Sequence, residues 1–151
     1  MNEIDLAYAA GIIDGEGYIG IIQLNRNKFN EMPRYQMRLT VSMATLAVPA
    51  WLHNTFGGSF YIFNSPCRKK PLQAWRVDSD KALAVLEIIY PYLKEKQQEA
   101  QIAIEFQKMR TVKRCNGNPK PLWETQIETI LAEQLADIHV RSAQYKGAKA
   151  D

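Results

Sequence analysis

Residues 34–43, RYQMRLTVSM, alternate between apolar and polar side chains over their whole length. The apolar set is Tyr35, Met37, Leu39, Val41 and Met43, and the polar set is Arg34, Gln36, Arg38, Thr40 and Ser42. This period of two predicts a β-strand that buries one face and leaves the other open. A chain with such a strand needs a sheet that is covered on one side only.

Three further segments predict partner strands, and helical patterns separate the pairs. The predicted strands are 18–26, 34–43, 59–63 and 73–77, and the predicted helices are 3–14, 45–56, 80–90, 94–109 and 122–144. Hairpins separated by helices indicate an α+β fold with one antiparallel, four-stranded, curved sheet and helices packed on one face. We expect a single domain over residues 1–151, because this length suffices for one core.

Local signals predict several details of these elements. Gly57 and Gly58 should stop the second helix, whose first turn contains Pro49. Asp78 or Ser79 can cap the third helix. The last helix should turn its apolar residues inward, namely Ile127, Ile130, Leu131 and Ile138.

The direction in which the first strand faces has two solutions. If Glu16 lies just before the strand, the even residues share its face, namely Tyr18, Gly20, Ile22, Leu24, Arg26 and Lys28. Alternatively Ile22 and Leu24 lie in the core, and Gln23 and Asn25 point outward. Arg76 lies between the core candidates Trp75 and Val77 and should therefore point outward with the polar set of 34–43.

The basic residues are concentrated in the middle of the chain. Residues 18–76 contain eight Lys and Arg and one acid, Glu31, and residues 108–120 contain five bases and no acid. Such a distribution indicates a polyanionic partner, although a solvated charged face also explains it. A two-stranded antiparallel ribbon fits the DNA major groove, where Gln36 suits adenine and Arg38 suits guanine.

Other classes of protein lack support in the sequence. No apolar run is long enough to span a membrane, and the acidic N-terminus lacks the basic region of a secretory signal, so we expect an intracellular protein. Cys67 and Cys115 fit two free thiols in a reducing compartment. His53 and His139 show no metal-ligand spacing, and no phosphate-binding glycine motif is present.

The first predicted helix ends in an unfavourable way. Its segment AAGIIDGEG contains three glycines and ends on Asp14 and Glu16. Glycine destabilises a helix interior by about 1 kcal/mol relative to alanine. Carboxylates are also disfavoured at the negative end of the helix dipole. A helix stop with two solvated acids is the plainest interpretation, and a functional role for the acids is the other.

The wider stretch LAYAAGIIDGEGYIGI resembles the signature of the LAGLIDADG homing endonucleases. Ala9 stands in place of the first leucine, Gly15 in place of an alanine and Glu16 in place of the last aspartate. The order of helix, hairpin, helix, hairpin and helices is similar to that family, and so is the segment YPYLKEKQQEA at residues 90–100.

The resemblance implies a site that two chains share. A single motif implies a homodimer with the motif helices at its interface, where the small residues Ala7, Ala10 and Gly11 would allow close approach. Glu16 would ligate a divalent cation, Mg²⁺ or Mn²⁺, together with the Gly15 carbonyl. Asp14 would be structural, and Lys96 would be a basic catalytic residue or simply an exposed lysine at a helix start.

The resemblance also implies a metal-dependent, site-specific endonuclease that binds a long, near-palindromic duplex. The candidate DNA-binding residues are Tyr18, Ile22, Leu24, Arg26, Lys28, Arg34, Gln36, Arg38, Thr40, Ser42, Arg68, Lys69, Lys70 and Arg76, with Lys113 and Arg114 as further phosphate contacts. Relatives often carry a glutamine near Thr45 and a base near Pro49, so the network that organises water differs here. An intron maturase, which would bind RNA, and a non-cleaving DNA-binding regulator are the alternatives.

Overall fold

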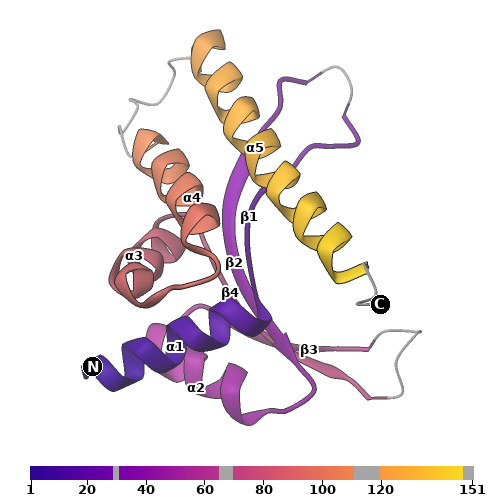
Figure 1. Ribbon diagram of the computed structural model, residues 1–151. Coiled ribbons are helices and arrows are strands. Elements are labelled where there is room, and N and C mark those ends of the chain that lie inside the picture. Colours follow the sequence, from indigo (N-terminus) through magenta and orange to yellow (C-terminus); the bar gives the residue numbers. More distant parts are fainter. Residues whose placement is uncertain (29–30, 65–69, 111–119, 148–151) are drawn as a thin grey trace.

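The computed structural model describes residues 1–28, 31–64, 70–110 and 120–147. Figure 1 shows a curved sheet with helices packed along one side of it. Within those residues the elements follow the order α1 (Glu3–Glu16), β1 (Gly17–Gln23), β2 (Tyr35–Met43), α2 (Ala47–Phe56), β3 (Ser59–Phe63), β4 (Leu72–Asp78), α3 (Ser79–Ile89), a 3₁₀ turn (Tyr90–Tyr92), α4 (Gln97–Arg110) and α5 (Leu122–Gly147). The predicted elements are all present, and most boundaries agree within about two residues.

The four strands form one antiparallel sheet in the order β1-β2-β4-β3. The α+β fold predicted from hairpins that helices separate is therefore correct, and so is the half-buried strand predicted from the alternation of residues 34–43. Tyr35, Met37, Leu39 and Val41 are buried, while their polar neighbours remain partly exposed. The sheet has a core face, covered by helices, and a face that we call the polar face.

The register shows which way β1 faces. Tyr18, Gly20 and Ile22 lie opposite Thr40, Arg38 and Gln36 of β2, so these even residues share the polar face. Ile19 is fully buried on the other side. The alternative that placed Asn25 outward is wrong, because Asn25 is buried in the turn after β1. Its side chain bonds the Met32 carbonyl and the Arg34 amide there.

The core lies between the sheet and the helices α1 to α4. Trp75 of β4 is fully buried at its centre, and its indole N–H donates to the Gly57 carbonyl over 2.7 Å. Gly57 and Gly58 end α2 as predicted, with φ of +70° and +91°. Those angles lie in the left-handed region, which glycine adopts without the penalty that other residues have.

The side of α5 that is turned toward the core differs from the prediction. Leu131 is buried as expected, but Ile127 and Ile130 are 38% and 52% exposed. Glu128, which is fully buried, takes the inward position and forms ion pairs with Arg110 (3.2 Å) and Lys120. These contacts tie α5 to the end of α4, and they turn the apolar residues of this helical turn outward.

Helix α5 also runs across the outer edge of the sheet. It contacts β1 and β2 in addition to α4, and Figure 1 shows it passing in front of β1. Among the described residues no helix has the length and apolar character needed to cross a membrane.

Candidate functional site

The C-terminal end of α1 is fastened to the segment that precedes α4. The Asp14 carboxylate accepts from the backbone amides of Lys94 (2.7 Å) and Lys96 (3.0 Å). In return, the Lys96 ammonium donates to the carbonyls of Ile13 (2.9 Å) and Asp14 (2.6 Å). A cation at a helix C-terminus is favourable because it faces the negative end of the dipole. Together, the two side chains fix the end of α1.

Glu16, the last residue of α1, remains exposed beside this junction. No hydrogen bond or ion pair engages its carboxylate among the residues that the structure describes. Gly17 follows at once and has no room for a side chain. A Cβ there would lie 2.6 Å from the Ile13 carbonyl oxygen and 2.8 Å from the Ile13 Cα. The missing side chain lets β1 leave directly from the helix end, which holds Glu16 at the start of the sheet.

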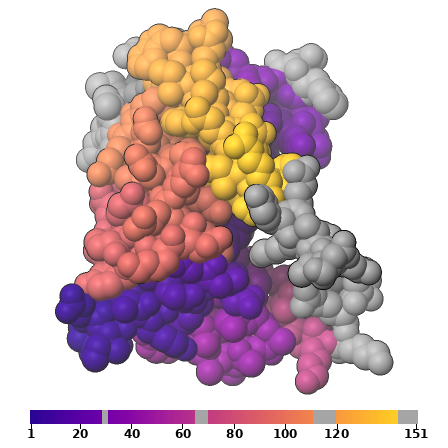
Figure 2. Space-filling model, in the orientation of Figure 1, coloured from indigo at the N-terminus to yellow at the C-terminus, as the bar shows by residue number. Residues whose placement is uncertain are grey.

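Glu16 opens into a cleft of about 580 Å³ between α1, α4 and α5. Figure 2 shows the surface of α1 along the lower edge of the molecule, adjoining α4, with α5 above. The cleft brings together all four residues that the sequence placed at the catalytic centre, Asp14, Gly15, Glu16 and Lys96. Its remaining lining residues are Gly17, Tyr18, Glu95, Glu99, His139, Ser142 and Ala143.

The oxygen ligands at this end of α1 would make up one half of a site for a hard cation. A free carboxylate and a carbonyl from the last turn of a helix, which lacks an intrahelical partner, are oxygen ligands of the kind Mg²⁺ and Mn²⁺ prefer. In the part of the chain that the structure describes, no cluster of three or more His, Cys, Asp or Glu could hold a metal. The described part of one chain therefore offers Glu16 and the Gly15 carbonyl, but no cluster that would surround a cation by itself.

Tyr18 links the cleft to the polar face. Its ring lies over Gly20, where a Cβ would come within 2.3 Å of the Tyr18 hydroxyl. The His139 ring of α5 also packs against Tyr18, with ring centroids 5.1 Å apart, and its Nε2 lies 3.5 Å from a Glu99 carboxylate oxygen. Burial raises the pKa of the Tyr18 hydroxyl above its usual 10, against the opposing effect of Arg38. Tyr18 therefore remains a neutral hydrogen-bond donor at physiological pH.

The polar face collects the strand residues that the sequence nominated for nucleic-acid binding. Gln36, Arg38, Thr40 and Ser42 of β2 lie beside Arg76 of β4, which pairs with Thr40 in register. The face also contains Ile22 of β1. All these side chains remain partly exposed. The strands thus present a mixed surface of guanidinium, amide and hydroxyl groups and one aliphatic side chain.

Other nominated residues lie at the ends of this face. Leu24, Arg26, Lys28 and Arg34 are exposed around the β1–β2 turn, where Lys28 forms a 3.1 Å ion pair with Glu31. Lys70 is exposed just before β4, near the opposite end of the sheet. Figure 1 shows the two hairpins projecting at the two ends of the molecule. Arg68, Lys69, Lys113 and Arg114 lie outside the described residues.

The basic segment 108–120 offers fewer free Lys and Arg side chains for binding a polyanion than its composition suggested. Lys108 pairs with Glu87 of α3 over 2.8 Å. Arg110 and Lys120 both pair with the buried Glu128, and Arg110 also donates to the Tyr35 carbonyl. These three bases fasten helices to each other and to the sheet.

The predicted contact surface of α1 needs one correction. Ala10 is fully buried against the chain's own core, so it cannot meet a second copy. The exposed positions of the helix form a different stripe at helical spacing, namely Ile4, Ala7, Tyr8, Gly11 and Gly15. Ala7 and Gly11 belong to it, and a Cβ at Gly11 would meet no atom of this chain within 4 Å.

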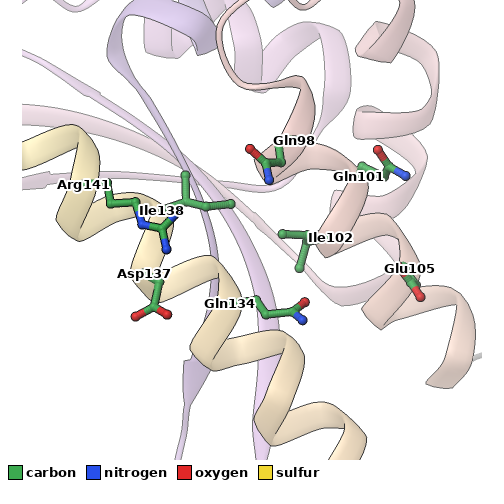
Figure 3. Close-up of a pocket in the computed structure, with 8 residues that line it drawn as sticks. All are labelled: Gln98, Gln101, Ile102, Glu105, Gln134, Asp137, Ile138 and Arg141. Atoms are coloured by element: carbon green, nitrogen blue, oxygen red, sulfur yellow. The ribbon is translucent and has the colours of Figure 1, made fainter.

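A second groove of about 420 Å³ runs between α4 and α5. Figure 3 shows its side chains, which are Gln98, Gln101, Ile102, Glu105, Gln134, Asp137, Ile138 and Arg141. Its lining comes from α4 and α5 alone, so it lacks the helix-end carbonyl of Gly15 and the neighbouring Glu16 and Lys96 that line the first cleft. The cleft beside Glu16 is therefore the better candidate for chemistry on a phosphate.

Sequence reasoning missed Asp78 as part of the polar face. It was predicted as a possible cap of α3, but in the N-cap position its side chain makes no capping hydrogen bond. It pairs instead with Arg38 (2.8 Å) and Arg76 (3.1 Å). The period of two that pointed Arg76 outward would also have pointed Asp78 outward. Tyr61 and Phe63 of β3, both exposed, were missed as well.

No known family model matches the sequence, and no curated protein matches it. Solved structures match its fold. An archaeal intron-encoded homing endonuclease, I-Vdi141I, complexed with DNA, has a TM-score of 0.71 at 14% identity, over 89% of this chain and 84% of that one.

Two further solved structures extend the comparison. The homing endonuclease I-CvuI, in complex with its target in the presence of Ca, has a TM-score of 0.60 at 16% identity, over 88% of this chain and 95% of that one. The LAGLIDADG meganuclease I-CpaMI, bound to uncleaved DNA, has a TM-score of 0.56 at 19% identity, over 70% and 36% of the two chains. The curved sheet with its helical layer is thus the fold of these nucleases.

Proposed function

We propose that this chain, which has the fold of the LAGLIDADG homing endonucleases, is a site-specific DNA endonuclease that acts as a homodimer. The observation that carries the proposal is the junction of α1 and β1. There an exposed carboxylate, Glu16, stands at the edge of a sheet face that contains Arg38 and Arg76. Solved structures with this fold were determined with DNA, which supports a duplex as the polyanion.

The polar face suits a duplex major groove. Antiparallel strands fit that groove, and side chains at alternate positions of β1, β2 and β4 can reach base edges. The exposed basic side chains around the β1–β2 turn, Arg26, Lys28 and Arg34, are placed to contact phosphates. Ile22 offers an apolar contact for a thymine methyl group.

A second copy of the chain would complete the cation site. One chain supplies one carboxylate at the α1–β1 junction, Glu16, and the exposed stripe of α1 carries small residues that let two helices approach closely. A two-fold axis beside α1 would bring two Glu16 carboxylates together. Such symmetry gives a near-palindromic target.

Glu16 and the Gly15 carbonyl would hold Mg²⁺ or Mn²⁺ at this axis. When bound, a divalent cation between carboxylates lowers the pKa of a water molecule and polarises the phosphate. The Asp14 carboxylate keeps Glu16 in place through its bonds to the amides before α4. Lys96 places a positive charge at the base of the cleft, where it favours binding of a phosphate.

The test compares cleavage with binding. The wild-type protein is incubated with Mg²⁺ and a genomic or randomised duplex library, and the ends produced are sequenced. We expect discrete ends at a long, near-palindromic site. Glu16→Gln should bind the same site with cleavage reduced by about 10³-fold or more, because the amide is a poor ligand for a hard cation.

Glu105→Gln is the matched control, because it removes a carboxylate from the second groove and should cut normally. Equal cleavage by Glu16→Gln and the wild type would refute the proposed role of Glu16. Selective binding without cleavage by the wild type would instead favour a regulator, and selective RNA binding would favour a maturase.

A further inference from the structure

The polar face contains a charged cluster that joins two strands. Asp78 of β4 lies opposite Arg38 of β2 in register, and Arg76 lies two residues before Asp78 on the same strand. The Arg38 Nε donates to the Asp78 Oδ1 over 2.8 Å, and the Arg76 Nε lies 3.1 Å from the Oδ2. Each carboxylate oxygen therefore faces one guanidinium group.

We propose that Arg38, Asp78 and Arg76 form one recognition unit for guanine bases, in which Asp78 is a positioning residue that fixes both arginines. The proposal rests on the proposed DNA-binding function and adds a base preference and the residue that sets it. Three observations support it.

The first observation is the set of donors that remains. An arginine has five N–H groups, one at Nε and four at the two terminal nitrogens. Asp78 faces both Nε atoms, and no residue in the described part of the chain is bonded to the terminal nitrogens, so each fork can reach a ligand. Guanine presents two adjacent acceptors in the major groove, O6 and N7, and an arginine fork matches them bidentately.

The second observation is that the cluster is fixed and partly open. The side chains of Arg38 and Arg76 are 24% and 33% exposed, and that of Asp78 is 23% exposed. Arg76 has a further restraint, since its guanidinium lies 5.9 Å from the centre of the Tyr61 ring. An arginine that is already oriented loses less side-chain entropy when it binds a base.

The third observation is that Asp78 forgoes its ordinary local role. An aspartate in the N-cap position normally accepts from the first amides of its helix, but Asp78 makes no such bond. The next residue, Ser79, has φ of +51°, which is unfavourable for a residue other than glycine. The chain turns sharply into α3 here, while Asp78 stays aligned with the polar face.

The two charges of the arginines also explain how an acid is tolerated on a surface for DNA. An unpaired carboxylate there would repel phosphates. With two guanidinium groups beside it, the unit keeps a net charge of about +1. Because diagonal neighbours on adjacent strands are about 7–8 Å apart and base pairs rise about 3.4 Å, the two guanines should lie within about three base pairs.

The experiment is a binding selection that gives a base preference at each position. Wild-type protein is incubated, without divalent cations so that nothing is cut, with a duplex library randomised over about 20 base pairs. The variants Arg38→Ala, Arg76→Ala, Asp78→Asn and Asp78→Glu are selected in parallel. Glu87→Gln is the control, because it removes a carboxylate that forms an ion pair with Lys108 away from the sheet.

We expect two guanine positions in each half of the wild-type consensus. Arg38→Ala should erase the preference at one of them and Arg76→Ala at the other. Asp78→Asn should reduce the preference at both by about tenfold, with the rest of the consensus unchanged. Asp78→Glu retains the charge but shifts it by one methylene, so it should weaken the same two positions, and Glu87→Gln should weaken none.

Several results would overturn the inference. An unchanged base profile in Asp78→Asn would show that the carboxylate does not set the preference. Uniform loss of affinity in the arginine variants, with no change in base profile, would show that they contact phosphates. A wild-type protein that selects a site without these guanines refutes this unit alone. A wild-type protein that binds no duplex refutes the proposed function as well.

Discussion

Three residues close to each other at the end of α1 have different structural roles. Asp14 accepts from two backbone amides, Glu16 stays exposed at the cleft, and Gly17 makes the exit to β1 possible. The segment AAGIIDGEG contains all three, and the sequence motif gave roles to Asp14 and Glu16. The lysine contact was not predictable in the same way, because Lys96 lies 82 residues from Asp14 and reaches the backbone of α1 rather than its acids.

Gly17→Ala tests whether the exit from α1 into β1 requires a residue without a side chain. A Cβ would lie 2.6 Å from the Ile13 carbonyl oxygen and 2.8 Å from the Ile13 Cα, and neither backbone atom can move freely. We expect the free energy of unfolding to fall by about 1–3 kcal/mol, measured by urea denaturation. Gly15→Ala, compared at a concentration where light scattering shows a monomer, is the control, since its Cβ meets no atom of this chain within 4 Å. An equal loss in both variants would contradict the steric explanation.

At the scale of elements, strands were easier to predict than helix facing. Alternation in residues 34–43 placed one face of β2 in the core, because a strand in a half-covered sheet has only two faces to choose from. Helix α5 offers many rotations, and its apolar residues do not select the observed one. Glu128 selects it through partners that lie outside the helix, Arg110 and Lys120. A local pattern cannot reveal such partners.

Glu128→Ala should therefore destabilise the protein strongly. The substitution removes a fully buried side chain and leaves the partly exposed Arg110 and Lys120 without their carboxylate, which should cost about 2–3 kcal/mol. Thermal or urea unfolding followed by circular dichroism measures this loss. Glu87→Ala breaks an exposed pair with Lys108 and should cost less than about 1 kcal/mol. Similar losses for the two variants would show that the buried network does not hold α5.

At the scale of the whole molecule, Lys and Arg residues lie at both ends of the polar face, and Asp14 and Glu16 lie at the α1–β1 junction beside it. Arg26, Lys28 and Arg34 occupy one end, and Lys70 the other. The composition predicted this surface in outline. It could not show that Lys108, Arg110 and Lys120 are engaged with acids of the helices, because those pairs join distant parts of the chain.

Binding to duplex DNA should depend steeply on salt. If a dimer neutralises about eight phosphates, the logarithm of the binding constant should fall against the logarithm of salt concentration with a slope of about −7. Fluorescence anisotropy with a labelled duplex, without divalent cations, measures this slope. Lys28→Ala and Arg34→Ala should each make it shallower by about 2 in a dimer. A nearly flat slope would contradict binding through the polar face.

The clasp between α1 and the segment before α4 has a consequence for biosynthesis. Its four hydrogen bonds join residues 80 to 83 positions apart. A growing chain therefore produces β1 and both hairpins before the residues that fix Glu16 have been made. Closing so long a loop has an entropic cost, which contacts within the assembled sheet and α3 can offset. A nascent or truncated chain that ends before Lys94 would thus lack all four bonds that hold Glu16 in place, and the end of α1 would become ordered late in folding.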